Sequence, residues 1–558
     1  MVTDLADEFV INISKIKPRT KKRQCVRSAF FPFHLFFLAI AFVLWSGMSM
    51  AFGDTTVMTG SLLKAVRMDI VANGQTIGFA TIPSGTTVIV TSVTDDGVLI
   101  RRSDEEAPFK IPKDSISVQM PVSATEKPTP SQPQDAVVTQ ARVTSSTETN
   151  SAVIPSAEQM NKALGIPLFG NGSLWEENDA MVAGHLGWPE ESKTAYEAGY
   201  RRYPYTFNVG TKVLGARALS LFLQGINDKV SRVAILFANK GDVAFFSSAE
   251  EAKQQAAHPK QPLNVTDNML RECHDAMQSD KNTIETALNS LLGPSRPARI
   301  GRFASMSEAG QRWDWKGHTF LLVAQPNEYV TLRILPTATF DDPDADKKSF
   351  QATKETISKR VEHRENGDVV ITDLPMVNQG RKGYCVPATF ERVLRYYGLS
   401  EDMNILAMAG QTRAGGGTSI NAIEGATFNV IHDAGGIITQ KNFSGSILEI
   451  KPFIDAGKPI LFGHFSTLEF NKRVNERMQY RVAVSNWDDW QNKFLPSLKK
   501  STPLQPDPLY SHVCLIIGYN QKTREIAISD SWGPAATERW MTEEEAQQIK
   551  QSGISVIE

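Results

Sequence analysis

The sequence predicts a multidomain protein of the α+β class, and three observations support this prediction. Apolar and polar residues alternate between positions 60 and 119, as they do in short β-strands. Residues 159–345 contain helical and strand-like stretches without a regular strand–helix–strand rhythm, which favours α+β over a parallel α/β arrangement. After residue 384 an amphipathic helical stretch precedes several apolar strand-like runs. The C-terminal domain is therefore expected to pack a helix on an antiparallel sheet.

Residues 1–53 are predicted to be a targeting segment. Seven basic residues lie between Lys15 and Arg27, an apolar run extends from Ala29 to Trp45, and small residues continue to Gly53. This order is typical of a secretory signal peptide, but residues 29–52 are also long enough to be retained as a membrane anchor. Both interpretations place the bulk of the chain outside the cytoplasm. We expect an exported protein, in the periplasm or cell envelope or secreted, that residues 29–52 can tether to the inner membrane.

Residues 54–119 are predicted to form a small β-barrel. Turn signals at 73–74, 83–85 and 95–97 divide the alternating pattern into short strands. The pattern resembles bacterial Src-homology-3-like barrels, which implies either a structural adaptor or a contact with the cell envelope. Residues 120–158 are rich in Pro, Ser, Thr, Gln and Ala and poor in apolar residues. They are predicted to be a disordered linker, because such a segment cannot bury a core.

Residues 159–345 are predicted to be an α+β domain, and no motif in them indicates a function. A helix is expected over 213–222, and strands over 233–237 and 319–323. Cys273-His274-Asp275 is not interpreted as a triad, because adjacent residues of a helix point in different directions. Trp313 and Trp315 are interpreted as core or interface residues rather than a carbohydrate platform.

A charged connector, residues 346–365, is predicted to lead into a C-terminal domain at 366–558. The connector is expected to include a helix over 354–364, and a strand over 369–372 should follow it. Cys385 is then predicted to begin a helix that stops before Gly398, with Pro387 in its first turn. A helix N-terminus stabilises negative charge, so the Cys385 thiol should ionise more readily than a free cysteine.

Four short pieces of this domain together indicate a thiol active site. They are Gln379, Gly383-Tyr384-Cys385-Val386-Pro387-Ala388, Ser511-His512 and Asp530-Ser531-Trp532-Gly533. His512 opens one apolar run and Asp530 ends the next, 127 and 145 residues after Cys385. A nucleophilic cysteine needs a base, a group that orients the base and a donor to the oxyanion, and the four pieces contain these residue types.

The pieces resemble the papain-like cysteine peptidase superfamily, and within it a stand-alone bacterial form of the bacteriocin-leader-processing, double-glycine branch. In papain-type enzymes the histidine and the orienting residue follow the cysteine by ~130 to 150 positions. The resemblance covers about the last third of the chain, and Asp530 stands where papain has asparagine. It implies that Cys385 is the nucleophile, His512 the acid and base, Asp530 its orienter and Gln379 an oxyanion donor. It also implies that Trp532 shields the imidazole from water.

Two other histidines, a glycine-rich run and a charged insertion of this domain are given no catalytic role. His432 and His464 are not followed by an acidic residue and Trp-Gly at the right interval, so His512 is the preferred base. The run 415–419 lacks the ending of a phosphate-binding loop and is interpreted as a flexible rim of the cleft. Residues 468–508 are a charged insertion, which is expected to form a wall or lid of the cleft.

The predicted function is an exported cysteine peptidase acting on a peptide or protein substrate. A net charge of −2 provides no basic excess, so nucleic acid is not expected as a partner. The sequence shows no metal-ligand spacing and no cofactor motif, and neither group is expected. Two alternatives stay open. The domain could be a catalytically silent papain-fold binding protein of the cell envelope, or an amide transferase or deamidase that uses the same site.

Overall fold

The computed structural model describes residues 59–64, 66–72, 75–82, 87–94, 97–101, 109–119, 154–204, 210–257, 263–301, 306–342, 356–399, 401–499 and 502–558. The predicted targeting segment, residues 120–153 of the predicted linker and residues 346–355 of the connector lie outside these ranges. None of the helices in the described ranges combines the length and apolarity needed to cross a membrane.

The N-terminal residues form short antiparallel strands, as the alternating pattern predicts. A five-stranded sheet has the order β6-β5-β4-β1-β7, and β2 and β3 form a separate pair. Seven apolar side chains, including Val88, Val98 and Ile100, make a small core. Within the described residues no ladder joins β6 to β7, so the closed barrel stays a prediction. The strands are β1 Thr59–Leu62, β2 Val66–Ala72, β3 Gln75–Ile82, β4 Thr87–Thr94, β5 Gly97–Arg101, β6 Phe109–Ile111 and β7 Ile116–Gln119.

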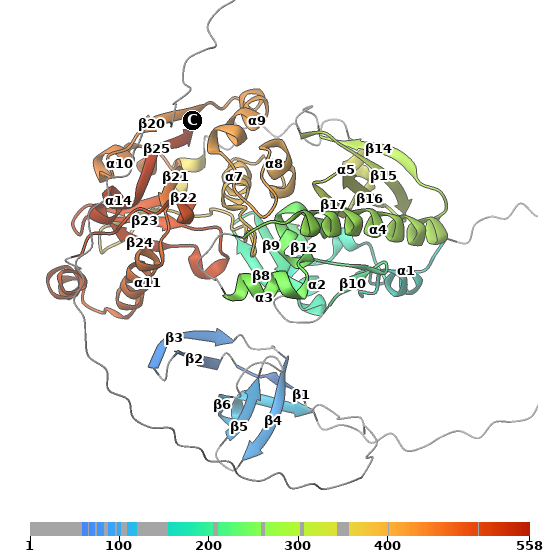
Figure 1. Cartoon of the computed structure of the whole chain (residues 1–558), viewed down its shortest axis with the longest axis horizontal. Coiled ribbons are helices and arrows are strands. Elements are labelled where there is room, and N and C mark those ends of the chain that lie inside the picture. The colour runs from blue at the N-terminus through green and yellow to red at the C-terminus, as the bar shows by residue number, and fades with distance from the viewer. Residues whose placement is uncertain are drawn as a thin grey trace, which may run out of the picture.

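Residues 154–342, the middle unit, form an eight-stranded antiparallel sheet with the order β14-β15-β16-β17-β13-β12-β9-β8. The long helix α4 crosses this sheet (Figure 1). The strands are β8 Glu190–Lys193, β9 Glu197–Arg202, β10 Lys212–Val213, β11 Ala216–Arg217, β12 Ser220–Ile226, β13 Lys229–Asn239, β14 Arg296–Ile300, β15 Glu308–Trp315, β16 His318–Gln325 and β17 Tyr329–Pro336. The helices are α1 Ala157–Leu164, α2 Asp179–Leu186, α3 Ala249–Ala257, α4 Asp267–Leu292 and α5 Thr337–Asp341.

One predicted helix in this part of the chain is wrong, and a second is shorter than predicted. Residues 213–222 contain the small hairpin β10–β11 and the start of β12 instead of a helix. Gly215, with φ of 83°, makes the turn of the hairpin, and a short apolar run does not distinguish a buried strand from a helix. The helix expected over 354–364 is helical at 356–357 and continues as a 3₁₀ turn at Ser358–Arg360. It does not extend to 364, because Val361–His363 forms the strand β18 and pairs with β19. The strands expected at 233–237 and 319–323 are confirmed as parts of β13 and β16.

Residues 356–558, the C-terminal unit, form a second antiparallel sheet with helices on it. Its main path is β18-β19-β22-β21-β25-β20, and β23 joins β22 to β24. The strands are β18 Val361–His363, β19 Asp368–Ile371, β20 Ile438–Asn442, β21 Ile460–Phe465, β22 Ser511–Asn520, β23 Glu525–Ser529, β24 Arg539–Thr542 and β25 Lys550–Ile557. The helices are α7 Cys385–Tyr396, α8 Met403–Ala409, α9 Ile420–Asp433, α10 Ile447–Asp455, α11 Leu468–Ala483, α12 Trp487–Asp489, α13 Leu495–Leu498 and α14 Glu543–Ile549. The predicted α+β class is confirmed.

The sheet of the middle unit buries both of its faces. Successive side chains of a strand point to opposite faces. Phe320 and Leu322 of β16 belong to the core under α4, whereas the alternate residues Leu321 and Val323 belong to the core of the C-terminal unit. The middle unit and the C-terminal unit therefore share one continuous apolar core, and Figure 1 shows α7 and α8 between the two sheets.

The helix α7 shows the effect of this arrangement. Its residues from Val386 to Tyr396 are all buried, although Glu391, Arg392 and Arg395 are charged. Arg392 faces the C-terminal sheet, where it donates to the carbonyl oxygens of Pro375 and Ser529 at 2.9 and 3.0 Å. On the opposite side, Arg395 donates to Glu197 of β9 at 2.8 Å. The helix is thus held between the two units and not on the surface of one of them.

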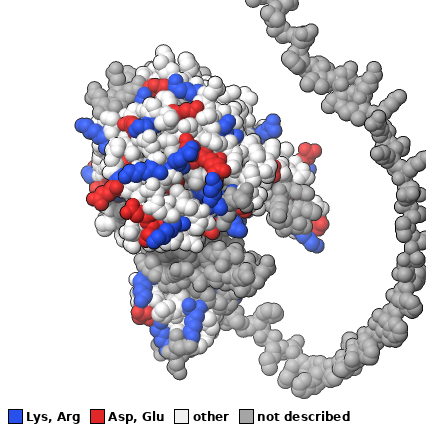
Figure 2. Space-filling model, turned by 90° about the vertical axis from the view of Figure 1, so that its left-hand side faces the viewer, with Lys and Arg blue, Asp and Glu red and all other residues white. Residues whose placement is uncertain are grey.

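On the face of the C-terminal unit drawn in Figure 2, basic and acidic side chains are mixed without a broad area of one sign. A surface of this kind has no electrostatic footprint for a polyanion.

Candidate active site

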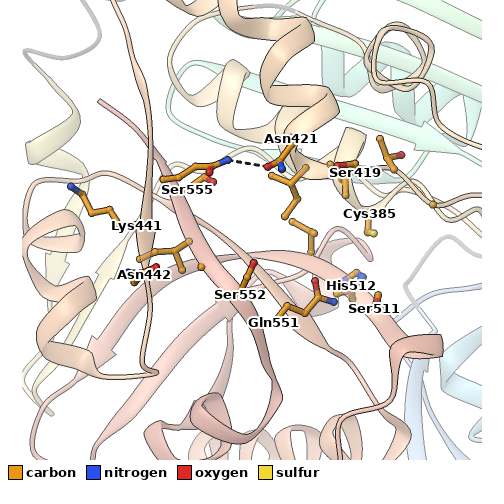
Figure 3. Close-up of a pocket in the computed structure, with 18 residues that line it drawn as sticks. Cys385, Ser419, Asn421, Lys441, Asn442, Ser511, His512, Gln551, Ser552 and Ser555 are labelled. Carbon is orange, nitrogen blue, oxygen red and sulfur yellow. Dashed lines mark hydrogen bonds between the residues drawn. The ribbon is translucent and has the colours of Figure 1, made fainter. Parts of the chain in front are cut away.

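The C-terminal sheet brings together three of the predicted catalytic residues. Cys385 is the first residue of α7, His512 is the second residue of β22, and Asp530 directly follows β23. Because β22 and β23 are antiparallel neighbours, the residue after β23 lies beside the beginning of β22. Cys385 and His512 line the same cavity, and Figure 3 shows them at one end of it.

Asp530 determines the orientation of the imidazole. His512 Nε2 lies 3.0 Å from Asp530 Oδ1, so this ring nitrogen carries the proton that it donates to the carboxylate. Both side chains are buried, at 8% and 0% exposure. The other ring nitrogen, Nδ1, is thereby left for the Cys385 thiol, which hydrogen-bonds the imidazole.

A fourth residue, Arg539, completes the site. From β24, its Nη1 donates to Asp530 Oδ2 at 2.5 Å, so each carboxylate oxygen has its own donor. Arg539 Nη2 in turn donates to Asn471 at 2.8 Å and to Asn475 at 3.1 Å, both on α11. Sequence reasoning missed this residue, because Arg539 is one arginine in a polar stretch and only the pairing of β23 with β24 brings it to Asp530.

The charges of the three groups reinforce one another. Burial opposes ionisation of Cys385, but the hydrogen bond and charge of His512 lower the pKa of the thiol below its ordinary value. Burial likewise opposes protonation of His512, but hydrogen bonds to Asp530 and Cys385 raise its pKa to about 9. For Asp530, burial is outweighed by His512 and Arg539, which hold the pKa of the carboxyl well below its usual range. Both shifts favour a thiolate on Cys385 beside an imidazolium on His512.

Trp532 covers the imidazole. Its ring centroid lies 4.7 Å from that of His512, and 38% of its surface is exposed. The guanidinium of Arg539 lies 5.2 Å from the same tryptophan ring. The indole thus stands between the His512–Asp530 pair and solvent, the position that the resemblance implies.

Gln379 is buried in the loop that leads to Cys385. Its backbone N–H donates to Ser531 O at 2.9 Å, which joins this loop to the segment after Asp530. Its side-chain Nε2 donates to the carbonyl of Lys382 at 2.9 Å. One of the two N–H bonds of the carboxamide is used in this way, and Gln379 is not among the described residues that line the cavity at Cys385.

An open cavity of about 730 Å³ extends from Cys385 and His512. The N-terminal end of α9, the strands β20 and β25 and the start of β22 line it (Figure 3). Its polar lining consists mainly of hydroxyl and amide groups, with Lys441 as an ammonium, and no carboxylate belongs to the described lining. Gly417, Thr418 and Ser419 lie on the cavity wall, as the interpretation of 415–419 as a rim of the cleft predicts.

The insertion at 468–508 does not form a wall of this cavity, and that expectation is wrong. Its main helix, α11, packs against β24 and provides Asn471 and Asn475 to Arg539. Residues of the described part of the insertion line a different cavity of about 720 Å³, together with Thr467 and Tyr510. The insertion therefore acts on the site indirectly, through the partners of Asp530.

The second histidine of the sheet, His464, is a neutral neighbour of the site. It lies opposite His512 in the β21–β22 ladder and is fully buried. Burial and then the charge of His512 lower its pKa to about 3, so it cannot serve as a proton donor near neutral pH. His432 has no place in the site, because it is exposed at the end of α9.

His464, Cys514 and Asp530 are a group of potential metal ligands in the described part of the chain, with ligand atoms within 4.8 Å of one another. Both oxygens of Asp530 already accept hydrogen bonds, from His512 and Arg539. The guanidinium of Arg539 would also repel a cation there. The arrangement suits the imidazole better than a metal ion, and the expected lack of a metal stays a prediction.

Neither the Cys-His-Asp sequence nor the tryptophan pair of the middle unit lines the cavity at Cys385. Cys273 is buried on α4, while the pair His274 and Asp275 is exposed. Trp313 and Trp315 are buried in the core under α4, at 3% and 4% exposure. These observations agree with the structural interpretations made from the sequence.

Residues 371–552 match the model of the Peptidase_C39 like family. The match covers Cys385, His512, Asp530 and Gln379 and supports the papain-like cysteine peptidase superfamily for the C-terminal unit. No curated protein is significantly similar to the chain.

Proposed function

We propose that the chain is an exported cysteine peptidase whose C-terminal unit hydrolyses peptide bonds. The observation that carries the proposal is the Cys385–His512–Asp530 arrangement at one end of an open cavity. A retained scaffold without activity would have no need for a buried carboxylate that keeps an imidazolium beside a thiol.

In the first half of the reaction the Cys385 thiolate attacks the carbonyl carbon of the scissile bond. The carbonyl oxygen becomes an oxyanion, which accepts hydrogen bonds from the Gln379 carboxamide and from the backbone N–H of Cys385. His512 Nδ1 then gives its proton to the leaving amine as the C–N bond breaks. A thioester between Cys385 and the acyl part of the substrate remains.

In the second half a water molecule attacks the thioester carbonyl. His512, now neutral, accepts a proton from the water, and Asp530 holds its tautomer and stabilises the imidazolium that forms. The C–S bond breaks, the acid product leaves, and the thiolate–imidazolium pair is restored. An amine in place of water would give amide transfer, and a substrate side-chain amide would give deamidation, through the same thioester.

The test is turnover of a mixed peptide library by the purified chain, with the products identified by mass spectrometry. Hydrolysed peptides that disappear with Cys385→Ala and with His512→Ala support the proposal. Amine-exchanged or deamidated products would assign the transferase or deamidase alternative. Turnover by Cys385→Ala equal to that of the wild type would sink the proposal, and no turnover by the wild type would favour the silent binding protein.

Export is the second part of the proposal. It rests on the basic region and apolar run of residues 1–53 and on the sequence pattern alone. Cell fractionation of the full chain, and of a variant with charges placed in the apolar run, tests it. Cytoplasmic peptidase in both cases would contradict export, and the size of the exported form distinguishes a cleaved signal from a retained tether.

A further inference from the structure

We infer that the middle unit is an integral part of the active-site scaffold, in which Asp242 and Lys382 position the loop that carries Gln379. This inference rests on the proposed function. The sequence indicated no role for residues 159–345, whereas the structure places polar groups of this unit directly against residues 378–384, here called the Gln379 loop. Asp242 and Lys382 are positioning residues, because neither lines the cavity at Cys385.

The central contact is a buried ion pair between the two units. Lys382 Nζ lies 3.0 Å from Asp242 Oδ2, and the side chains are 0% and 2% exposed. The ammonium lies 5.7 Å from the ring centroid of Tyr203 and 5.4 Å from that of Tyr384. Desolvation makes a buried pair a weak source of net stability, but removing one partner leaves an uncompensated charge and is strongly destabilising. Such a pair enforces one arrangement of the two segments of the chain that it joins.

Both ends of the Gln379 loop are held by the middle unit. At its beginning, Tyr203 donates its hydroxyl to Asn378 O at 2.5 Å, and Asn378 N donates to Glu191 at 2.8 Å. At its end, the Tyr384 hydroxyl donates to Asn239 Oδ1 at 2.7 Å. Tyr384 directly precedes Cys385, so this hydrogen bond also fixes the first turn of α7.

The ion pair is linked to Gln379 through one hydrogen bond. Gln379 Nε2 donates to the backbone carbonyl of Lys382 at 2.9 Å, so the direction of the carboxamide depends on where Lys382 lies. The Lys382 side chain is anchored by Asp242, which follows β13. A shift of the ion pair would therefore move the proposed oxyanion donor. Misplacing a catalytic group by about 1 Å can cost about 100-fold in rate.

The middle unit and the Gln379 loop pack so closely near Asp242 that even a small added side chain would not fit. A Cβ atom on Gly241, the neighbour of Asp242, would lie 2.4 Å from the Tyr384 ring. On the other side of the Gln379 loop, Gly383 bridges Gly416, and Gly415 N donates to Lys240 O of the middle unit at 3.0 Å. The middle unit thus contacts the Gln379 loop and the glycine rim of the cleft together.

The test uses the full chain with Asp242→Asn, Lys382→Met and the double variant. The matched control is Glu308→Gln, Arg333→Met and their double, because Arg333 and Glu308 form a pair of similar burial, 8% and 0%, inside the middle unit. For each protein we would measure kcat and KM for a library peptide, the alkylation rate of Cys385, and hydrogen exchange of residues 378–384. Values of kcat are normalised to the Cys385 that is alkylated rapidly at acidic pH, because the thiol of an unfolded chain, with a pKa of ~8.5, is labelled slowly there.

We expect each single variant of the Asp242–Lys382 pair to lower kcat by about 10- to 100-fold with little change in KM. Cys385 alkylation should stay within about 2-fold, because His512 controls the thiolate, while the Gln379 loop exchanges faster. The loss in the double variant should be smaller than the product of the two single losses, as for coupled residues. The control pair should lower thermal stability and leave the normalised kcat unchanged.

Normal kcat and normal loop exchange in both single variants would overturn the inference, even if their melting temperatures fall. A chain whose wild type turns over no peptide would contradict the proposed function instead. In that case the exchange of residues 378–384 still decides whether Asp242 and Lys382 position the Gln379 loop.

Discussion

His512 Nε2 lies 3.0 Å from Asp530 Oδ1, where papain-type enzymes present an asparagine. The partner of the imidazole is therefore a negative charge and not only a hydrogen-bond acceptor. With Arg539 as its second partner, the carboxyl of Asp530 keeps a pKa well below its usual range. Burial lowers the pKa of His512, but its hydrogen bonds to Asp530 and Cys385 and the charges of both groups raise this pKa to about 9.

Asp530→Asn tests the role of this charge. An asparagine keeps a hydrogen-bond acceptor for Nε2 but removes the charge, so the pKa of His512 should fall below about 9. The alkaline limb of the kcat/KM profile should move to lower pH, and kcat/KM at pH 8 should fall by about 10-fold. Asp488→Asn, at an exposed position in α12, is the control. An alkaline limb that does not move would show that the charge is not what protonates the imidazole.

The pH dependence of alkylation tests the thiolate. Because the pKa of Cys385 is lowered by His512, iodoacetamide should label it rapidly well below the ~8.5 of a free thiol. Cys273 and Cys514 are internal controls, since burial raises the pKa of Cys273 to about 12 and also raises that of Cys514. In His512→Ala the labelling of Cys385 should slow and shift to higher pH. Equal rates for the three cysteines would contradict the ion pair.

Arg539→Gln removes the second partner of Asp530. The folded-state pKa of the Asp530 carboxyl should rise toward its unfolded value of ~3.9. In the wild type, the lowered pKa of Asp530 contributes to the free energy of unfolding above the unfolded pKa, and this contribution is lost as the pH falls below that value. In the variant the contribution is smaller, so its free energy of unfolding should decrease less on acidification. Removing one partner of a buried pair costs about 3 to 5 kcal/mol.

Urea unfolding of Arg539→Gln between about pH 2 and 7 measures these effects, because the contribution of Asp530 is lost below about pH 5. The kcat/KM should fall by about 10-fold as His512 loses its orientation. Arg524→Gln is the control, because the Arg524 side chain is 73% exposed in its pair with Glu543. Such an exposed pair contributes only about 0 to 1 kcal/mol. Equal destabilisation by the two substitutions would remove the special role of Arg539.

Two glycines of neighbouring segments should respond in opposite ways to alanine. Gly416 has φ of 120°, and a Cβ there would lie 2.4 Å from Gly383 Cα, next to Tyr384 and Cys385. We expect Gly416→Ala to cost at least about 2 kcal/mol and to lower kcat. Gly425 lies inside α9 with nothing within 4 Å of an added Cβ. Gly425→Ala should stabilise the protein by about 0.5 to 1 kcal/mol, and thermal unfolding compares the two variants.

The lining of the cavity predicts a preference for acidic or polar substrates. Lys441 belongs to the rim of a cavity of hydroxyl and amide groups without a carboxylate in its described lining, and its ammonium lies 5.7 Å from the Phe453 ring. Peptides with an acidic side chain near the scissile bond should have a lower KM than matched basic peptides. Lys441→Glu should raise the KM of acidic peptides by about 5- to 10-fold and lower that of basic ones, with kcat nearly unchanged. A salt-independent KM for both peptide classes would contradict this assignment.

The local pattern of the catalytic residues was readable from the sequence. The helix at Cys385, the strand at His512 and the strand before Asp530 are confirmed as α7, β22 and β23, because each is a continuous apolar run with a clear boundary. The roles of these residues and of Gln379 in catalysis stay predictions until activity is measured.

Other features depend on tertiary contacts and could not be predicted. Arg539 reaches Asp530 through the pairing of two strands, and Asp242 reaches Lys382 across 140 residues of sequence. The sequence does not show that Arg392 and Arg395 of α7 are buried, because their partners lie in distant segments of the chain. Residues 213–222 were mistaken for a helix, because burial on both sides hides the period of two that marks a strand.

The two-sided burial of the middle sheet has a consequence for how parts of this chain can be excised or exchanged. Removal of residues 356–558 would expose the apolar side chains of Leu321, Val323 and Leu236. The C-terminal unit would in turn lose the sheet that packs against its core near α7. Excised at the family boundary, residue 371, either half should aggregate. The transferable module for domain grafting is consequently the whole of 154–558.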